Sequence, residues 1–456
     1  MVAMERTLGI ETRKHVGKTV LVKGWVQTRR DHGKLIFIDL ADRSSIIQIV
    51  FNPKVSQKAY DTATELKNEF VIAVTGKVNK RPENLINPKI ATGTVEIEAT
   101  DLEILSKAET LPFDMGMEAL NLELPTLLDW RSLTLRHPKS KAIFTVQAAI
   151  VESFRQITTK LSCVEIFAPT IVASATEGGA EVFRVDYYDH KAFLSQSPQL
   201  YKQMLVPVFE RVFTLAHAYR AEPSVTTRHL SESTQMDCEF GFVDFGQLLD
   251  LLEEVGTYTL RETEKKSANE LAVFDVPKIA FGEIARLTLR EAQEIIFKET
   301  GRDVRSQKDL APQDEVDICA WARKTHKSDF VTITHFPTAA KPFYTMPDPK
   351  DPEYSLSYDL LFRGLEIMSG SQRINDYNQL VKSIEERGMD PLQFDMYLQA
   401  FKYGMPPEGG FSFGLERMTM KLMGLANVRE ASLYPRDMER VDIRLSKHEE
   451  KKETKK

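Results

Sequence analysis

The chain has 456 residues, of which 42% are hydrophobic and 28% charged, with a net charge of -6 at pH 7. This length predicts two or three domains, and the three cysteines have no metal-ligand spacing, which argues against a zinc site and a disulfide framework. No apolar run approaches the roughly 18 residues of a membrane span, and the first residues lack the apolar core of a signal peptide. We therefore expect a cytosolic protein that does not contact membranes.

The front segment, residues 1–107, is the basic part of the chain. It carries 17 Lys and Arg against 13 Asp and Glu, a net charge of +4, whereas the remainder carries -10. Five strand-like runs cover residues 19–26, 35–40, 46–51, 70–78 and 94–105, with a helix-like stretch at 57–69. The order βββαββ is that of the OB-fold, a five-stranded barrel used to hold single-stranded nucleic acid. The sequence therefore predicts an OB-fold β-barrel over 1–107.

Prolines interrupt residues 108–138, which predicts a hinge, and the pattern then changes over 139–456. Helix-like periods cover 140–161, 248–265, 394–403 and 415–425, and strand-like runs cover 329–334 and 355–368. Residues 270–335 form an elaborated or inserted segment whose role the sequence leaves open. Strands adjacent in sequence and dispersed among helices favour an antiparallel sheet flanked by helices. The predicted fold class is α+β.

Two motifs concentrate the charges and glycines that a polyphosphate ligand requires. Tyr219-Arg-Ala-Glu222 is followed by Thr226-Thr-Arg-His-Leu-Ser-Glu232, and Gly409-Gly-Phe-Ser-Phe-Gly414 precedes Arg417. An arginine fork can grip phosphate oxygens through two parallel hydrogen bonds. Neither glycine run has the form of the common nucleotide-binding loops. The motifs predict a site for ATP that is held in another way.

These residues resemble the motifs of a known family, the aspartyl-tRNA synthetases of class II. The first block above resembles motif 2, the second resembles motif 3, and Val164-Glu-Ile-Phe-Ala-Pro169 resembles motif 1, whose proline lies at the dimer interface. More specific matches are Thr176-Glu-Gly-Gly179, Gln196-Ser-Pro-Gln-Leu-Tyr-Lys202 and Ser369-Gly-Ser-Gln-Arg373. The likeness runs from about residue 15 to 437, and the large bacterial insertion between motifs 2 and 3 is absent. The catalytic part therefore resembles the archaeal and eukaryotic type.

The resemblance implies roles for individual residues. Arg220 and Arg417 are the expected catalytic arginines, since cationic stabilisation of the phosphates suffices for amino-acid activation. The implied ATP-binding residues are Arg220, Glu222, Arg228, His229, Glu366, Gly414 and Arg417. The implied aspartate-binding residues are Glu177, Gln199, Lys202, Arg220, Asp237, Ser369 and Arg373. Lys202 and Arg373 are expected to receive the acidic side chain, and a neutral asparagine would then leave Lys202 unpaired, which costs about 2 to 5 kcal/mol.

Two carboxylates, Asp359 and Glu366, are expected on a strand pair that turns at Arg363-Gly364. A two-residue turn pairs position 361 with 366, so that 359 and 366 become diagonal neighbours about 7 to 8 Å apart. Both carboxylates could then reach one Mg2+ or its waters. The resemblance adds Ser369 to these metal ligands, which requires a bulge at Ser369-Gly-Ser371 because 366 and 369 have opposite parity. The other reading of this segment is a solvated acidic hairpin.

In the barrel, Arg30, Phe37 and Gln48 lie where the family binds anticodon bases. Stacking of a base on an aromatic ring contributes about 1 to 3 kcal/mol, although Phe37 also fits a plain core position. Two positions depart from the family or vary within it. Ser233 stands where many relatives have an aromatic residue that stacks on adenine, and Gln27 lies where enzymes that charge one tRNA differ from those that charge two.

The resemblance thus implies a homodimeric aspartate-tRNA ligase that uses L-aspartate, ATP and tRNA(Asp), with Mg2+ as cofactor. One alternative is a non-discriminating enzyme that also charges tRNA(Asn), and a weaker one is an asparaginyl-tRNA synthetase. A rival of another class is an inactive paralogue that only binds RNA through its barrel. Lys202 separates the aspartyl from the asparaginyl reading.

Overall fold

The computed structural model describes the chain except for residues 1–3, 117–118, 174–180, 223–225 and 447–456. The chain divides into two compact units, Met1–Asn121 and Leu122–Lys456. Among the described residues, no helix is both long enough and apolar enough to cross a membrane.

The first unit is a closed five-stranded barrel, as predicted. Its strands are β1 (Thr19–His32), β2 (Leu35–Ala41), β3 (Ile46–Phe51), β4 (Val71–Lys80) and β5 (Val95–Ser106), in the order β1-β2-β3-β5-β4. Alternate residues of β1, such as Val20, Val22 and Val26, point into the core. Helix α1 (Gln57–Ala63) begins as expected but ends six residues early, since a turn leads to Glu69 in left-handed backbone. The OB-fold is thus confirmed.

The second unit is built on an eight-stranded sheet in the order β12-β13-β14-β15-β16-β11-β10-β6. The strands are β6 (Val164–Glu165), β10 (Arg211–Tyr219), β11 (Glu232–Gly241), β12 (Ala285–Thr288), β13 (Phe330–Thr334), β14 (Ser357–Phe362), β15 (Glu366–Gln372) and β16 (Glu408–Gly414). All neighbours are antiparallel except β6 with β10 and β12 with β13. A small second sheet contains β7 (Ile171–Val172), β8 (Arg184–Tyr187) and β9 (His190–Leu194). The predicted antiparallel, helix-flanked sheet is confirmed.

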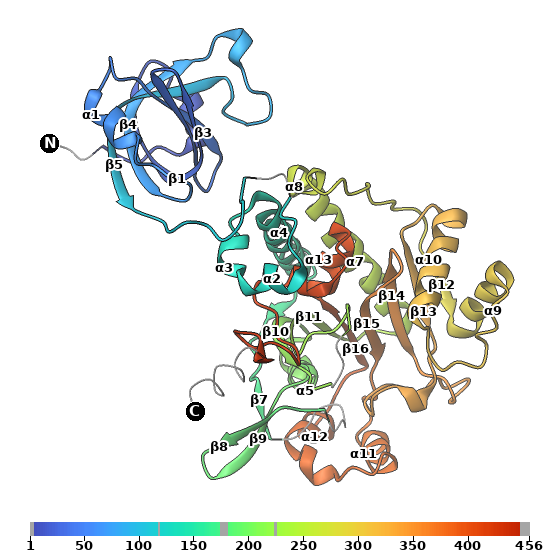
Figure 1. Ribbon diagram of the computed structural model, residues 1–456. Coiled ribbons are helices and arrows are strands. Elements are labelled where there is room, and N and C mark those ends of the chain that lie inside the picture. The colour runs from blue at the N-terminus through green and yellow to red at the C-terminus, as the bar shows by residue number, and fades with distance from the viewer. Residues whose placement is uncertain (1–3, 117–118, 174–180, 223–225, 447–456) are drawn as a thin grey trace. The chain divides into compact units, whose positions relative to one another are not determined.

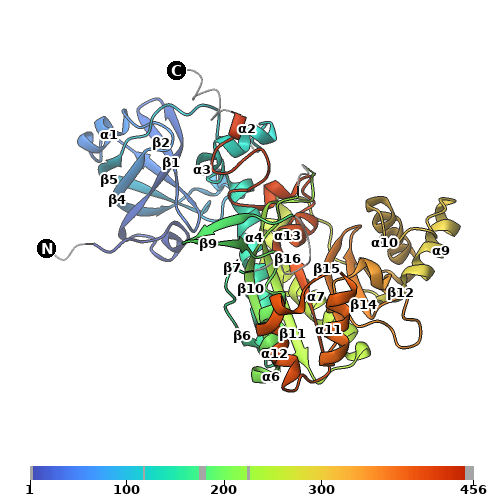
Figure 2. The ribbon, with the colours of Figure 1, turned by 90° about the horizontal axis from the view of Figure 1, so that it is seen from below.

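Three helices, α4 (Pro138–Lys160), α7 (Phe245–Lys266) and α13 (Leu415–Met423), cover one face of this sheet (Figure 1). The remaining α-helices are α2 (Leu124–Asp129), α3 (Arg131–Thr134), α5 (Gln199–Met204), α6 (Val206–Phe209), α8 (Ala268–Ala272), α9 (Leu289–Thr300), α10 (Pro312–His326), α11 (Tyr377–Glu386) and α12 (Asp395–Lys402). Both views place α9 and α10 beside β12 and β14, at one edge of the sheet (Figure 2). The elaborated segment 270–335 therefore extends the sheet and covers its edge.

The helix-covered face contains the large core of the unit. Met236, Cys238 and Phe240 of β11 and Phe411 and Phe413 of β16 are buried in that core with α4 and α7. Because successive side chains of a strand point to opposite faces, the residues between them must point to the other face. That face of the sheet is where polar side chains gather.

Candidate active site

A row of polar side chains crosses four adjacent strands of the sheet. Strand register places Asp237 of β11 opposite Ser412 of β16, Ser412 opposite Ser369 of β15, and Ser369 opposite Asp359 of β14. These four residues are far apart in sequence, and antiparallel pairing alone brings them into line. The row connects the motif 2, motif 3 and carboxylate segments that the sequence singled out.

The predicted hairpin of β14 and β15 turns at Arg363 and Gly364, both of which have positive φ angles of 48° and 80°. Leu361 lies opposite Glu366, as the two-residue turn predicts. The expected bulge at residues 369–371 is wrong in position, because Ser369 pairs regularly and the register shifts at Ile367 instead. This extra residue places Glu366 and Ser369 on the same face.

Asp359, Glu366 and Ser369 thus form a group that suits a hard divalent cation. Asp359 is buried, its Oδ1 atom has no hydrogen-bond partner, and its Oδ2 lies 3.6 Å from Lys341 Nζ. Burial and the nearby Glu366 raise the pKa of Asp359 to about 7, although Lys341 opposes this shift. The described residues contain no group of three or more His, Cys, Asp or Glu side chains that could hold a metal ion. Two carboxylates and a hydroxyl fit Mg2+, which keeps several waters or phosphate oxygens as its other ligands.

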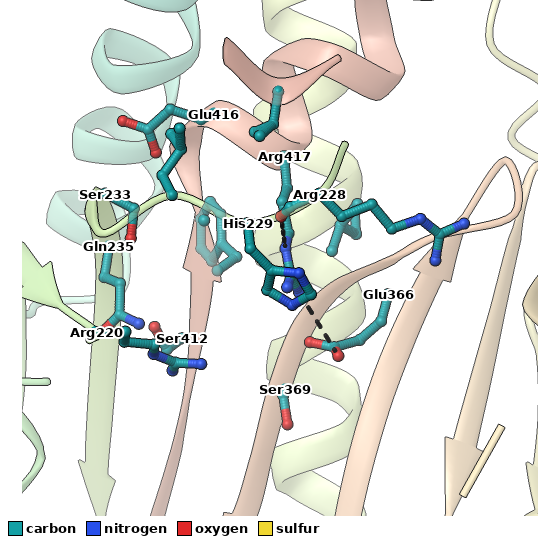
Figure 3. Close-up of a pocket in the computed structure, with 15 residues that line it drawn as sticks. Arg220, Arg228, His229, Ser233, Gln235, Glu366, Ser369, Ser412, Glu416 and Arg417 are labelled. Atoms are coloured by element: carbon teal, nitrogen blue, oxygen red, sulfur yellow. Dashed lines mark hydrogen bonds and ion pairs between the residues drawn. The ribbon is translucent and has the colours of Figure 1, made fainter. Parts of the chain in front are cut away.

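A cavity of about 320 Å³ opens between the loop after β10 and the start of α13 (Figure 3). It is lined by the predicted residues Arg220, Arg228, His229, Glu366, Gly414 and Arg417, and also by Ser233, Gln235, Ser369, Ser412 and Glu416. Arg417 Nε donates to the carbonyl oxygen of Arg228 at 3.4 Å, and its Nη1 lies 3.9 Å from Glu366 Oε2. Glu222 lies beside this cavity rather than in its wall, 4.0 Å from Arg220.

Three arginines, Arg220, Arg228 and Arg417, line this cavity together with two glutamates, Glu366 and Glu416. Burial and the neighbouring Arg417 lower the pKa of His229 below its ordinary value, so His229 is neutral at pH 7. Its Nδ1 lies 2.6 Å from Thr226 Oγ1, which fixes the ring. Arg228 Nη1 donates to Glu315 Oε2 at 2.9 Å, a contact that the sequence did not predict.

A second cavity of about 170 Å³ adjoins the first. It is lined by the predicted residues Gln199, Lys202, Asp237, Ser369 and Arg373, and it shares Arg220, Gln235, Ser369 and Ser412 with the first cavity. Because these residues line both cavities, the two are adjoining parts of one cleft. The side chain of Lys202 is only 1% exposed, which excludes a helix-surface lysine.

Lys202 already has two carboxylate partners in the absence of any ligand. Its Nζ lies 2.8 Å from Asp237 Oδ1 and 3.0 Å from Glu239 Oε2. Burial favours the neutral amine, but the two carboxylates outweigh it and raise the pKa of Lys202. The expectation that asparagine would leave Lys202 unpaired is therefore wrong. Any preference for an acid must come from the net charge of the pocket.

Sequence reasoning missed three buried residues of this network, Gln203, Glu239 and Glu408. Arg373 Nε donates to Glu239 Oε1 at 2.7 Å, and Gln203 donates to Glu408 at 2.7 Å. Burial and Glu239 raise the pKa of Glu408 well above its ordinary value, which favours the neutral acid. Strand alternation from Asp237 offers a signal for Glu239, since both point to the same face. Glu177, the remaining predicted aspartate ligand, lies outside the described residues.

In the barrel, the predicted anticodon residues lie on one outer surface. Arg30 of β1 pairs in register with Phe37 of β2, and Arg30 Nη2 donates to Asp39 at 2.9 Å. Gln48 of β3 lies opposite Asp39 and donates to Glu96 at 3.0 Å. Phe37 is half-buried and alternates with the core residues Ile36 and Ile38, so it does not belong to the barrel core.

Two family models match the chain. Residues 123–438 match the model described as tRNA synthetases class II (D, K and N), and residues 20–105 match the OB-fold nucleic acid binding domain. The chain is also similar over nearly its whole length to curated proteins. An Archaeoglobus fulgidus protein named aspartate-tRNA(Asp/Asn) ligase is 40% identical, covering 93% of this chain and 96% of the relative. A Pyrococcus horikoshii protein named aspartate-tRNA(Asp) ligase is 38% identical, with the same coverage.

Solved structures of similar fold include enzymes for two amino acids. The asparaginyl-tRNA synthetase of Pyrococcus horikoshii in complex with asparaginyl-adenylate aligns with a TM-score of 0.87 at 30% identity, covering 97% of this chain and 100% of that one. The aspartyl-tRNA synthetase of Entamoeba histolytica aligns with a TM-score of 0.85 at 30% identity, covering 96% and 93%. The fold alone therefore does not distinguish the two substrates.

Proposed function

The chain belongs to the class II (D, K and N) tRNA synthetases, ligases that use ATP, and we propose that it attaches L-aspartate to tRNA(Asp). The observation that carries the choice of aspartate is the pocket around Lys202 and Arg373. It adjoins the arginine-lined cavity through shared wall residues, so an amino acid in one meets a nucleotide in the other. Relatives named for aspartate at 38 to 40% identity support the same choice.

The proposed first step is attack of the aspartate α-carboxylate oxygen on the α-phosphorus of ATP. A bond forms between this carboxylate oxygen and the α-phosphorus. At the same time the bond between the α-phosphorus and the oxygen that bridges to the β-phosphate breaks, and pyrophosphate leaves with the negative charge. Arg220, which lines both cavities, is positioned to contact the carboxylate and the α-phosphate together. Arg228 and Arg417 line the nucleotide cavity where they can stabilise the departing charge. The terminal ribose hydroxyl of the tRNA then attacks the aspartyl carbonyl, and AMP leaves.

The charges of the amino-acid pocket indicate where the side chain and the ammonium group of the substrate bind. Lys202 and Arg373 are proposed to face the acidic side chain, while Asp237 and Gln199 are proposed to form the ammonium site. In the empty pocket Lys202 and Arg373 are balanced by Asp237 and Glu239. When Asp237 binds the substrate ammonium, one positive charge is left for the aspartate β-carboxylate, with Glu408 counted as neutral because its pKa is raised. A neutral asparagine cannot compensate that charge.

Mg2+ is the proposed cofactor, held by Asp359, Glu366 and Ser369. When bound, it supplies a positive charge that offsets phosphate charge. The orphaned Asp359 Oδ1 and the strand register that aligns these three residues support the assignment. Chelation of divalent ions should abolish pyrophosphate exchange, and titration with Mg2+ should restore it.

The decisive test is ATP-pyrophosphate exchange with aspartate and with asparagine. Exchange with aspartate at least a hundredfold above asparagine is expected, and exchange with asparagine alone would contradict the assignment. The second candidate is charging of both tRNA(Asp) and tRNA(Asn), favoured by relatives named for both tRNAs, including one from Thermus thermophilus that is 39% identical and covers 96% of this chain and 99% of that protein. Aminoacylation of the two purified transcripts side by side decides between them.

Binding of tRNA is assigned to the barrel surface, where Phe37 can stack on an anticodon base and Arg30 and Gln48 can bond base edges. A homodimer is proposed through the motif 1 region. Phe144, Ala148 and Val151 of α4 line an open apolar groove, and Phe167 is 86% exposed nearby in sequence. Light scattering of the purified protein should give twice the chain mass of 51.9 kDa.

A further inference from the structure

Glu315 of α10, in the segment 270–335, contacts Arg228, which lines the nucleotide cavity. Its Oε2 accepts a hydrogen bond from Arg228 Nη1 at 2.9 Å. The Glu315 side chain is 13% exposed and that of Arg228 24%, so the pair is largely withdrawn from water. A charge-assisted bond in such a place contributes more than a surface ion pair.

Helix α10 is anchored so that Glu315 cannot move freely. Asp314 caps the helix by accepting from the Ala311 backbone nitrogen at 2.9 Å, and it also pairs with Arg302 at 2.8 Å. On the other side, Val316 packs against Gly364, where an added Cβ would come within 2.9 Å of it. The turn between the carboxylate-bearing strands β14 and β15 therefore packs directly against the first turn of α10.

The pairing leaves part of the Arg228 guanidinium available. Only Nη1 is engaged: within the part of the chain that the structure describes, Nε and Nη2 donate to no protein acceptor. Arg228 lines the cavity, and Figure 3 shows it reaching from its loop toward the side where Glu366 lies. Its carbonyl oxygen is held by Arg417, so backbone and side chain are fixed by two different helices, α13 and α10.

Ionised Glu315 is costly at this position unless it has a function. Burial and the like charge of Glu366 raise the pKa of Glu315 to about 7, against the opposing effect of Arg228. Neutral glutamine would avoid this cost and still accept a hydrogen bond. The hydrogen bond from Arg228 to a helix that is anchored by Asp314 therefore orients the guanidinium.

We propose that Glu315 is a positioning residue of the nucleotide site, which holds the Arg228 guanidinium with its free edge toward the phosphates of ATP. The role rests on the proposed function only in that the cavity takes MgATP. Glu315 does not contact the nucleotide itself. It acts through Arg228, because preorganised donors bind a developing charge without reorganisation. The segment 270–335 thereby gains a function in addition to covering the sheet edge.

A double-mutant cycle on MgATP affinity tests this role, with the dissociation constant measured without amino acid or tRNA. Glu315→Ala and Arg228→Ala should each weaken binding roughly tenfold, as expected for loss of a charge-assisted contact. The dissociation constant of the double variant should lie within about twofold of that of Arg228→Ala, because Glu315 acts on the nucleotide site only through Arg228. Glu315→Gln should fall between wild type and Glu315→Ala. The aspartate KM should stay within about twofold of wild type.

The control is Asp317→Asn, which removes another carboxylate of α10, one that pairs with Arg302. It should leave MgATP affinity unchanged. Multiplicative losses in the double variant, or unchanged affinity in Glu315→Ala, would overturn the proposal. If Glu315→Ala fails to fold, as judged by its melting temperature, the cycle is run with Glu315→Gln. A wild-type chain that binds MgATP but exchanges no pyrophosphate with aspartate would refute the proposed function and leave this test valid.

Discussion

Replacement of Lys202 by methionine should remove most of the preference for aspartate over asparagine. In the proposed complex the substrate ammonium compensates Asp237, so that Lys202 and Arg373 less Glu239 leave one surplus positive charge in the pocket. Two unit charges about 4 Å apart interact by about 4 kcal/mol at an effective dielectric constant of 20. That energy corresponds to a factor of about 10³, and the remaining Arg373 reduces the expected loss to about 10² to 10³.

The assay is pyrophosphate exchange over a range of both amino acids, so that the ratio of kcat/KM values is obtained. Removal of Lys202 also leaves Asp237 and Glu239 short of a partner, which should lower stability by about 3 to 5 kcal/mol, so the melting temperature must be measured in parallel. Lys382→Met is the matched control, since Lys382 is exposed on α11 and pairs only with Glu386 there. An acid-to-amide ratio within threefold of wild type in a folded Lys202→Met protein would refute the reasoning.

Four further predictions concern other residues. Glu408→Gln should keep at least half of the aspartate exchange rate, because glutamine matches a neutral acid; a large loss would indicate an ionised Glu408. Gly410→Ala should destabilise the fold by about 1 to 3 kcal/mol in denaturant titrations, since its Cβ would lie 2.1 Å from the Cys238 carbonyl oxygen. Asp42→Ala should destabilise the barrel by about 1 kcal/mol. The Asp42 carboxylate accepts from the backbone nitrogens of Gly9, Ser44 and Ser45, and its pKa is lowered from 3.8 because these bonds and the Ser44 hydroxyl outweigh partial burial. That stability is therefore present above pH 3.8 and lost as the pH falls through the lower folded-state pKa. Phe37→Ala should raise the KM for tRNA at least fivefold without changing pyrophosphate exchange, as stacking on a base predicts.

Local patterns were sufficient for most of the fold. The barrel strands follow alternation of apolar residues, and the hairpin at Arg363-Gly364 follows from turn length, so its pairing of Leu361 with Glu366 could be predicted. The position of the bulge could not. Whether the extra residue falls at Ile367 or at Ser369 depends on packing against neighbouring strands, which a single strand does not encode.

The site was predictable where a motif carries the charge and less so where partners come from afar. Lys202 and Arg373 were identified by family likeness. Strand alternation indicates the face on which Glu239 lies, but its role as their shared partner became apparent only from the contacts of β11 with α5 and with the end of β15. No local sequence pattern indicated a role for Glu315, because the amphipathic pattern of its helix is that of an ordinary surface helix. Its meeting with Arg228 depends on how α10 docks beside the sheet.

The alternation of core and polar side chains along β11 and β16 has an evolutionary consequence. Met236 and Phe411 belong to the core, while their neighbours Asp237 and Ser412 belong to the cleft. A single-codon insertion or deletion within either strand would exchange these faces, burying carboxylates among aromatic rings and exposing the rings to substrate. Length variation is therefore expected to accumulate in connections outside the sheet, while β11 and β16 keep a constant length.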